Sequence, residues 1–95
     1  MKVLLIRLEL RAEWVKSLKE KRMIVLSISK RLSNKFNISV AEVDYQDIHQ
    51  NICIGISAIG TTKDILYALK EKIIDFVEDN TDAELIKIEE DIIDY

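Results

Sequence analysis

A run of basic side chains between residues 16 and 36 is the part of this sequence best suited to bind an anion. Four residues recur in it at offsets of four, three and four, which places them in one row of a helix: Lys19, Met23, Leu26 and Lys30. Such a row predicts a basic face with apolar patches that docks on RNA or on a protein partner. The alternative is an ordinary solvated helix in which Met23 and Leu26 fill the side of the core.

The start of this helix gives a second reason for an anion to bind. Ser17 followed by Glu20 matches a capping box, in which the serine hydroxyl accepts a backbone N–H and the glutamate reaches back. The unpaired N–H groups of the first turn and the helix dipole also favour a negative ligand. The cations that we predict to face phosphates are Lys19, Lys21, Arg22, Lys30 and Arg31.

A polar stretch further along the chain contains the other residues that could do chemistry: Asp44, Gln46, Asp47, His49 and Gln50. Carboxylates beside an imidazole could bind a metal or transfer protons. Their spacing fits no established metal motif, and hairpin loops commonly use Asp and Gln for turn hydrogen bonds. We therefore expect loop structure, ion pairs to Lys21 and Arg22, or contact with a partner, and we expect no catalytic residue, metal or cofactor.

Two single residues of reactive or stacking types each have a simple structural explanation as well. Trp14 precedes the basic helix and could stack on a base, although such a residue more often closes the end of a small core. Cys53 has no neighbour in sequence that would activate its thiol, so it is expected to be a small filler. No phosphate-binding loop, dinucleotide fingerprint, serine elbow or zinc spacing is present.

The composition bounds the class of protein. The 95 residues allow one domain, and 48% hydrophobic with 33% charged residues is typical of a folded, water-soluble chain. One cysteine cannot form an internal disulfide, which favours the cytoplasm, and no apolar run reaches the ~20 residues of a membrane span. The net charge of −3 divides into +7 over residues 1–36 and −10 over residues 37–95. This division predicts one basic surface, unless folding mixes the two halves.

The elements that must position these residues follow from hydrophobic periodicity. Leu4, Ile6, Leu8 and Leu10 alternate with polar residues, as in a half-buried strand. The pattern predicts strands at 2–11, 37–46, 52–59 and 83–93, with helices at 17–36 and 61–80. This βαββαβ order predicts an α+β, ferredoxin-like sandwich over residues 1–95, with a four-stranded antiparallel sheet and two helices on one face. Its other face would be open to solvent or to a partner.

Finer expectations concern the core and the ends of the elements. The predicted buried stripes are Leu18, Val25, Ile28, Leu32 and Phe36 in the first helix, and Ile65, Leu69, Ile73, Phe76 and Val77 in the second. The change of phase in the second strand predicts a β-bulge near Val40–Ala41. The topology places the start of the first helix and the loop 44–50 at the same end of the molecule.

Two blocks of this sequence, SLKEKR at 17–22 and AEVDYQD at 41–47 followed by Gln50, resemble the YlxP-like family of small bacterial proteins of unknown function. The resemblance spans nearly the whole chain and implies a ferredoxin-like fold without an assigned activity. The family's gene neighbourhood implies a role linked to RNA or the ribosome, sometimes likened to ribosome-binding factor A. The signature positions carried over are Ser17, Leu18, Lys19, Glu20, Lys21, Arg22, Asp44, Gln46, Asp47 and Gln50.

These observations favour a cytoplasmic, non-enzymatic module that binds ribosomal RNA or a ribosomal protein through the basic helix, with Met23 and Leu26 in the contact. Ser17, Glu20, Asp44, Gln46, Asp47 and Gln50 would support that surface by ordering the hairpin end and positioning the cations. One alternative is a protein-interaction module, such as a homodimer through the open sheet face. A third is an enzyme that uses Asp44, Asp47 and His49 on a phosphorylated small molecule.

Overall fold

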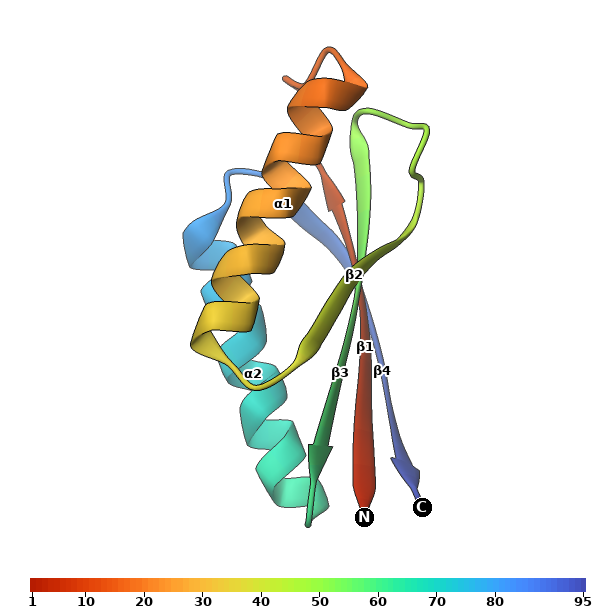
Figure 1. Ribbon diagram of the computed structural model, residues 1–95, viewed down its shortest axis with the longest axis vertical. Coiled ribbons are helices and arrows are strands. Elements are labelled where there is room, and N and C mark those ends of the chain that lie inside the picture. Colours follow the sequence, from red (N-terminus) through yellow and green to blue (C-terminus); the bar gives the residue numbers. More distant parts are fainter.

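The computed structural model describes residues 1–95 and has the predicted ferredoxin-like order of elements. These are β1 (Lys2–Arg11), α1 (Leu18–Lys35), β2 (Ser39–Asp44), β3 (Asn51–Gly60), α2 (Lys63–Asn80) and β4 (Glu84–Asp94). The strands form one antiparallel sheet in the order β2-β3-β1-β4. Both helices pack on the same face of this sheet, and the opposite face carries no further layer (Figure 1).

The core lies between the sheet and the helices and follows from the alternation in β1. Leu4 and Leu8 are fully buried and pair with Ala58 and Ile54 of β3. Each helix covers the core with one stripe of apolar residues. Their buried apolar residues are Ile28 and Leu32 of α1 and Leu66, Ile73, Ile74 and Val77 of α2.

Both helices begin at a hydroxyl cap. The Ser17 side chain accepts a hydrogen bond from the backbone N–H of Glu20 at 3.2 Å, and Thr62 accepts one from Ile65 at 3.2 Å. Each cap satisfies one backbone donor of the first turn. The return bond from the Glu20 carboxylate, expected for a complete capping box, is not formed. Neither helix combines the length and the apolar character needed to cross a bilayer.

The bulge in β2 lies further along the strand than predicted. The register with β3 shifts between Glu42 and Asp44, so the extra residue is Val43 and not Val40 or Ala41. Val43 lies over Gly55 of β3, where an added Cβ would approach the valine Cγ1 to 2.7 Å. Glycine at 55 therefore makes room for the bulged side chain.

The buried stripe of α2 also differs from the prediction by one position at its start. Ile65 was expected to face the core, but it is 55% exposed, and the neighbouring Leu66 is fully buried. In β4, a second register shift opposite Glu9 and Leu10 leaves Ile86 without a partner in β1. Ile86 and Ile88 are both exposed.

The molecule is elongated, with principal extents of 42 × 21 × 19 Å. The start of α1, the β1–α1 connection and the β2–β3 loop gather at one end, and both chain termini lie at the other (Figure 1). The two signature blocks therefore meet in space, as the topology predicts.

Candidate nucleic-acid interface

The outward surface of α1 carries basic side chains that form no ion pair within the chain. Lys19, Arg22, Lys30 and Arg31 are all exposed. None of them forms an ion pair, although the chain contains ten such contacts. The paired carboxylates of the later elements contact cations of the sheet and of α2 instead, apart from Glu42, which pairs with the buried Lys21. Folding therefore does not pair these four cations with the carboxylates of residues 37–95.

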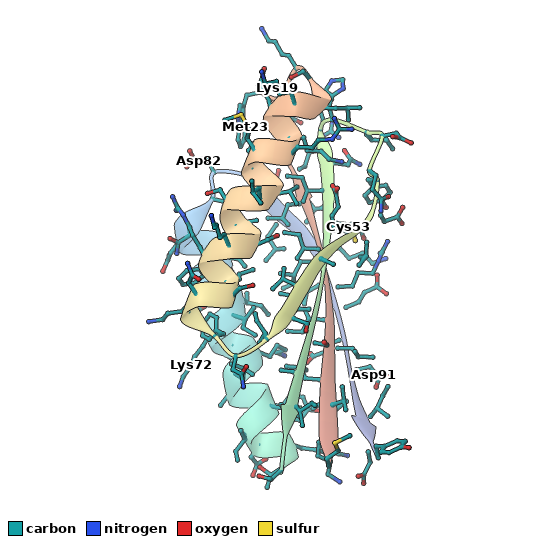
Figure 2. All side chains as sticks on the ribbon, in the orientation of Figure 1. Lys19, Met23, Cys53, Lys72, Asp82 and Asp91 are labelled. Carbon is teal, nitrogen blue, oxygen red and sulfur yellow. The ribbon has the colours of Figure 1, made fainter.

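The apolar residues of the predicted row point outward as well. Met23 is 64% exposed and Leu26 is 66% exposed, so neither fills the side of the core. Lys19 and Met23 follow one another along the outer side of α1 (Figure 2). The row Lys19, Met23, Leu26 and Lys30, together with Arg22 and Arg31, is called the α1 face below.

Because Met23 and Leu26 lie outside the core, replacing both by glutamine is expected to change the free energy of unfolding by no more than about 0.5 kcal/mol. Urea unfolding of the M23Q/L26Q variant measures this change. In contrast, Ile28→Ala on the buried side of the same helix is expected to lose about 2–5 kcal/mol, because it leaves a cavity. A loss of that size in M23Q/L26Q would show that the two side chains support the fold.

Lys21 is not part of this surface, and its predicted role in facing phosphates is wrong. Its side chain is fully buried and points toward the β2–β3 loop. The ammonium donates to the backbone carbonyls of Tyr45, of Ile48 at 2.8 Å and of Asn51 at 3.1 Å. An ammonium has three hydrogens, and these three carbonyls use all of them. Lys21 therefore orders the loop instead of binding a ligand.

Glu42 of β2 balances the buried charge. Its Oε2 lies 3.1 Å from the Lys21 ammonium, but this oxygen is buried and accepts no hydrogen bond. The two observations agree, because the lysine protons are already directed at the carbonyls. The contact between Glu42 and Lys21 is therefore an ion pair held by charge, with the hydrogen bonding supplied by the main chain.

Two further residues of the hairpin end, Asp44 and Gln50, also bind within the chain and away from α1. Asp44 accepts from Arg7 at 2.8 Å and from the backbone N–H of Tyr45 at 2.8 Å. The Gln50 side chain donates to the Glu13 carbonyl at 3.1 Å. Tyr45 has a left-handed backbone, with φ of 59°, a conformation that is rare outside glycine and that these contacts hold in place. Asp44 and Gln50 therefore order the hairpin end.

The proposed ion pairs from Asp44 and Asp47 to the cations of α1 are absent. Asp44 pairs with Arg7 of β1, and Asp47 has no bonded partner in the chain. Gln46 is likewise exposed and unbonded. Nor do Asp44, Asp47 and His49 converge on one point, and no group of three or more metal-binding side chains is found in the structure.

A charge network on the open sheet face was missed from the sequence. Arg7 lies at its centre and contacts Asp44, Glu89 at 3.1 Å and Glu9 at 3.4 Å. The Tyr45 hydroxyl donates to Glu9 at 2.5 Å, and this bond raises the pKa of the tyrosine. Hydrogen bonds from Lys87 and Arg7 lower the pKa of Glu89. Alternation in β1 could have placed Arg7 and Glu9 on this face, but their partners come from distant strands.

Cys53 lies in the same region of β3 and is fully buried. Burial raises the pKa of its thiol, and the nearby Arg7 only partly opposes this effect. The thiolate is therefore disfavoured, as expected for a structural filler and not for a nucleophile.

A groove borders the α1 face where the end of α2 approaches α1. Its volume is about 540 Å³, and it is lined by Trp14, Met23, Ile24, Ser27, Ile28, Arg31, Asp79, Asn80, Thr81 and Asp82. Trp14 is 49% exposed, so it does not close the core as a buried residue would. Arg31 reaches across the groove and donates to the Asn80 side chain at 3.4 Å. We call this cavity the Trp14 groove.

The two carboxylates of the Trp14 groove, Asp79 and Asp82, do not stabilise α2. Asp79 lies in the last turn of the helix, where no basic residue is present and the helix dipole is negative. A carboxylate there is unfavourable by roughly 0.3–1 kcal/mol. Asp82 follows in the connection to β4, and neither side chain forms an ion pair or a hydrogen bond. Both therefore remain free to accept hydrogen bonds from a ligand.

Comparison with known proteins confirms the resemblance that the two signature blocks indicate. A stretch of 47 residues is 45% identical to the uncharacterised protein YlxP of Bacillus subtilis (strain 168). It covers 50% of this chain and 51% of that protein, so the match spans about half the length of this relative. Residues 3–90 match the family described as "Protein of unknown function (DUF503)". Because that match includes nearly all of the fold, the chain belongs to the DUF503 family.

Proposed function

We propose that this protein is a non-enzymatic module that binds structured RNA, with ribosomal RNA as the expected class, through the α1 face. The observation that carries the proposal is the set of four exposed cations without ion pairs: Lys19, Arg22, Lys30 and Arg31. A cluster of this kind attracts the phosphate backbone and releases its counterions. The single unpaired Cys53 suits the reducing cytoplasm, where such RNA is found.

The geometry of the end of α1 adds to this support. In the first turn of the helix, the Glu20 and Lys21 N–H groups are bonded to Ser17, and the N–H groups of Leu18 and Lys19 precede them. Lys19 and Arg22 extend from the same turn into solvent. Backbone donors, dipole and side-chain charge therefore favour a phosphate at one place. Lys21, another cation of this turn, is directed inward and adds no charge to this place.

The test is a salt titration with a fluorescently labelled RNA hairpin, read by anisotropy. If four cations contact phosphates, log K should fall against log salt concentration with a slope of about −3 to −3.6. An affinity that does not change with salt, or no binding at low salt, would contradict the proposal.

A second candidate is a homodimer through the open sheet face. It is favoured by three exposed apolar residues on that face: Leu5, Ile59 and Ile93. These residues belong to the outward set of neighbouring strands, since Ile59 and Ile93 both pair with Val3. Light scattering that gives twice the monomer mass would support this candidate. Such a dimer would leave the α1 face accessible in each copy.

A further inference from the structure

We propose that the Trp14 groove takes an unpaired guanine base of the bound RNA, stacked on Trp14 and read by Asp79 and Asp82. This inference rests on the proposed function, because the base must belong to an RNA held on the α1 face. Contacts to phosphates do not distinguish one base from another, and the groove would add a preference for one base.

The first argument is the position of the groove beside the phosphate-binding cations. Met23 and Arg31 each belong both to the α1 face and to the lining of the groove. Figure 2 shows Met23 and Asp82 on the same side of the molecule, below Lys19. A strand whose phosphates follow Lys19 and Arg31 would therefore have a base within reach of the groove.

The second argument is the aromatic wall. Trp14 is the one tryptophan of the chain, and half of its side chain is open to solvent beside the groove. Proteins that read single-stranded RNA stack splayed bases on aromatic rings of this kind. The lining also includes Met23 and Ile24, and the volume of about 540 Å³ falls within the range of ~300–1,000 Å³ for small-ligand sites.

The third argument selects the base. Asp79 and Asp82 have no partner in the chain, and a carboxylate can only accept hydrogen bonds. The Watson–Crick edge of guanine presents two adjacent donors, the N1–H and the exocyclic amine, which match the two oxygens of one carboxylate. Adenine and cytosine each present an acceptor at that position, which would repel the carboxylate. Uracil presents a single donor between two acceptors. The unpaired charge of the groove therefore favours guanine over the other bases.

The experiment uses the full chain and three RNA hairpins that differ in one loop base: guanine, inosine or adenine. Trp14 fluorescence reports occupation of the groove, and anisotropy of a labelled RNA reports total binding. The guanine loop should quench Trp14 and bind about tenfold more tightly than the adenine loop. Inosine, which lacks the exocyclic amine, should fall between them.

Variants that keep the shape of the groove test the carboxylates. D79N and D82N together should remove the preference for guanine while leaving the salt dependence of binding. The control is D91N, which makes a carboxylate-to-amide change on β4, at a distance from Asp82 (Figure 2). It should preserve the preference.

The outcomes separate the two proposals. Salt-dependent binding that is equal for all three loops, without quenching of Trp14, would overturn the guanine site and leave the RNA-binding function intact. If no hairpin binds, both proposals fail. If an arginine-rich peptide quenches Trp14 and the RNA does not, the groove belongs to a basic protein partner and the inference is wrong.

Discussion

Lys21→Met is expected to lower the free energy of unfolding by about 3–5 kcal/mol, a large part of the stability of a domain this small. The substitution keeps most of the side-chain volume but removes the charge. It leaves the half-buried Glu42 carboxylate without a counterion and three backbone carbonyls without their donor. Urea unfolding followed by circular dichroism measures the loss.

Two further variants test whether the loss comes from the unpaired buried charge. In K21M/E42L no charge remains at the site, so much of the lost stability should return. The control is Lys19→Met, two residues away and exposed, which should stay within about 0.5 kcal/mol of the native protein. If K21M and K19M unfold at the same urea concentration, the interpretation of Lys21 as a structural cation is wrong.

Reversing two charges of the α1 face is the second change with a large expected effect. In K19E/K30E, two phosphate contacts are lost, and the salt slope of RNA binding should become smaller by about two units. If the two proteins bind equally at 1 M salt, this difference amounts to roughly a hundredfold weaker binding at 0.1 M. Anisotropy titrations of one RNA hairpin at several salt concentrations give both quantities.

The chain offers a matched control for this variant in α2. K63E/K72E also reverses two exposed lysines, and Lys63 lies in the first turn of α2 as Lys19 does in α1. Both variants have the same net charge. If only K19E/K30E loses affinity, the position of the charge matters. An equal loss in both would mean that RNA responds to total charge and that α1 is not the contact surface.

The fold was predictable because its strongest signals are local. The alternation from Leu4 to Leu10 fixed a half-buried strand, and the caps at Ser17 and Thr62 marked where the helices begin. The bulge was harder to place, since the extra residue at Val43 depends on the space that Gly55 leaves on the neighbouring strand. Periodicity within β2 detects a change of phase but not the partner that determines its position.

The candidate site likewise contains residues whose positions follow from local spacing and residues whose positions depend on distant segments. The outward row from Lys19 to Lys30 follows from helical spacing and is confirmed as exposed. Lys21 is predicted to face phosphates with Lys19 and Arg22, since lysine is rarely buried. Its spacing carried a signal to the contrary, since position 21 falls between Leu18 and Val25 on the predicted buried stripe. The three carbonyls that stabilise it there lie in another segment, and no local pattern reveals them.

The buried Lys21 also affects how solution measurements on this protein can be read. An ammonium surrounded by main-chain carbonyls and one carboxylate performs the task that a sodium or potassium ion performs in other loops, but here the cation is covalently attached. Mobile electrolyte neither supplies nor displaces it, and its burial limits screening. The support that Lys21 gives to the hairpin end is therefore expected to persist as ionic strength changes. In a titration with salt, we consequently expect the exposed charges to respond and Lys21 to stay in place.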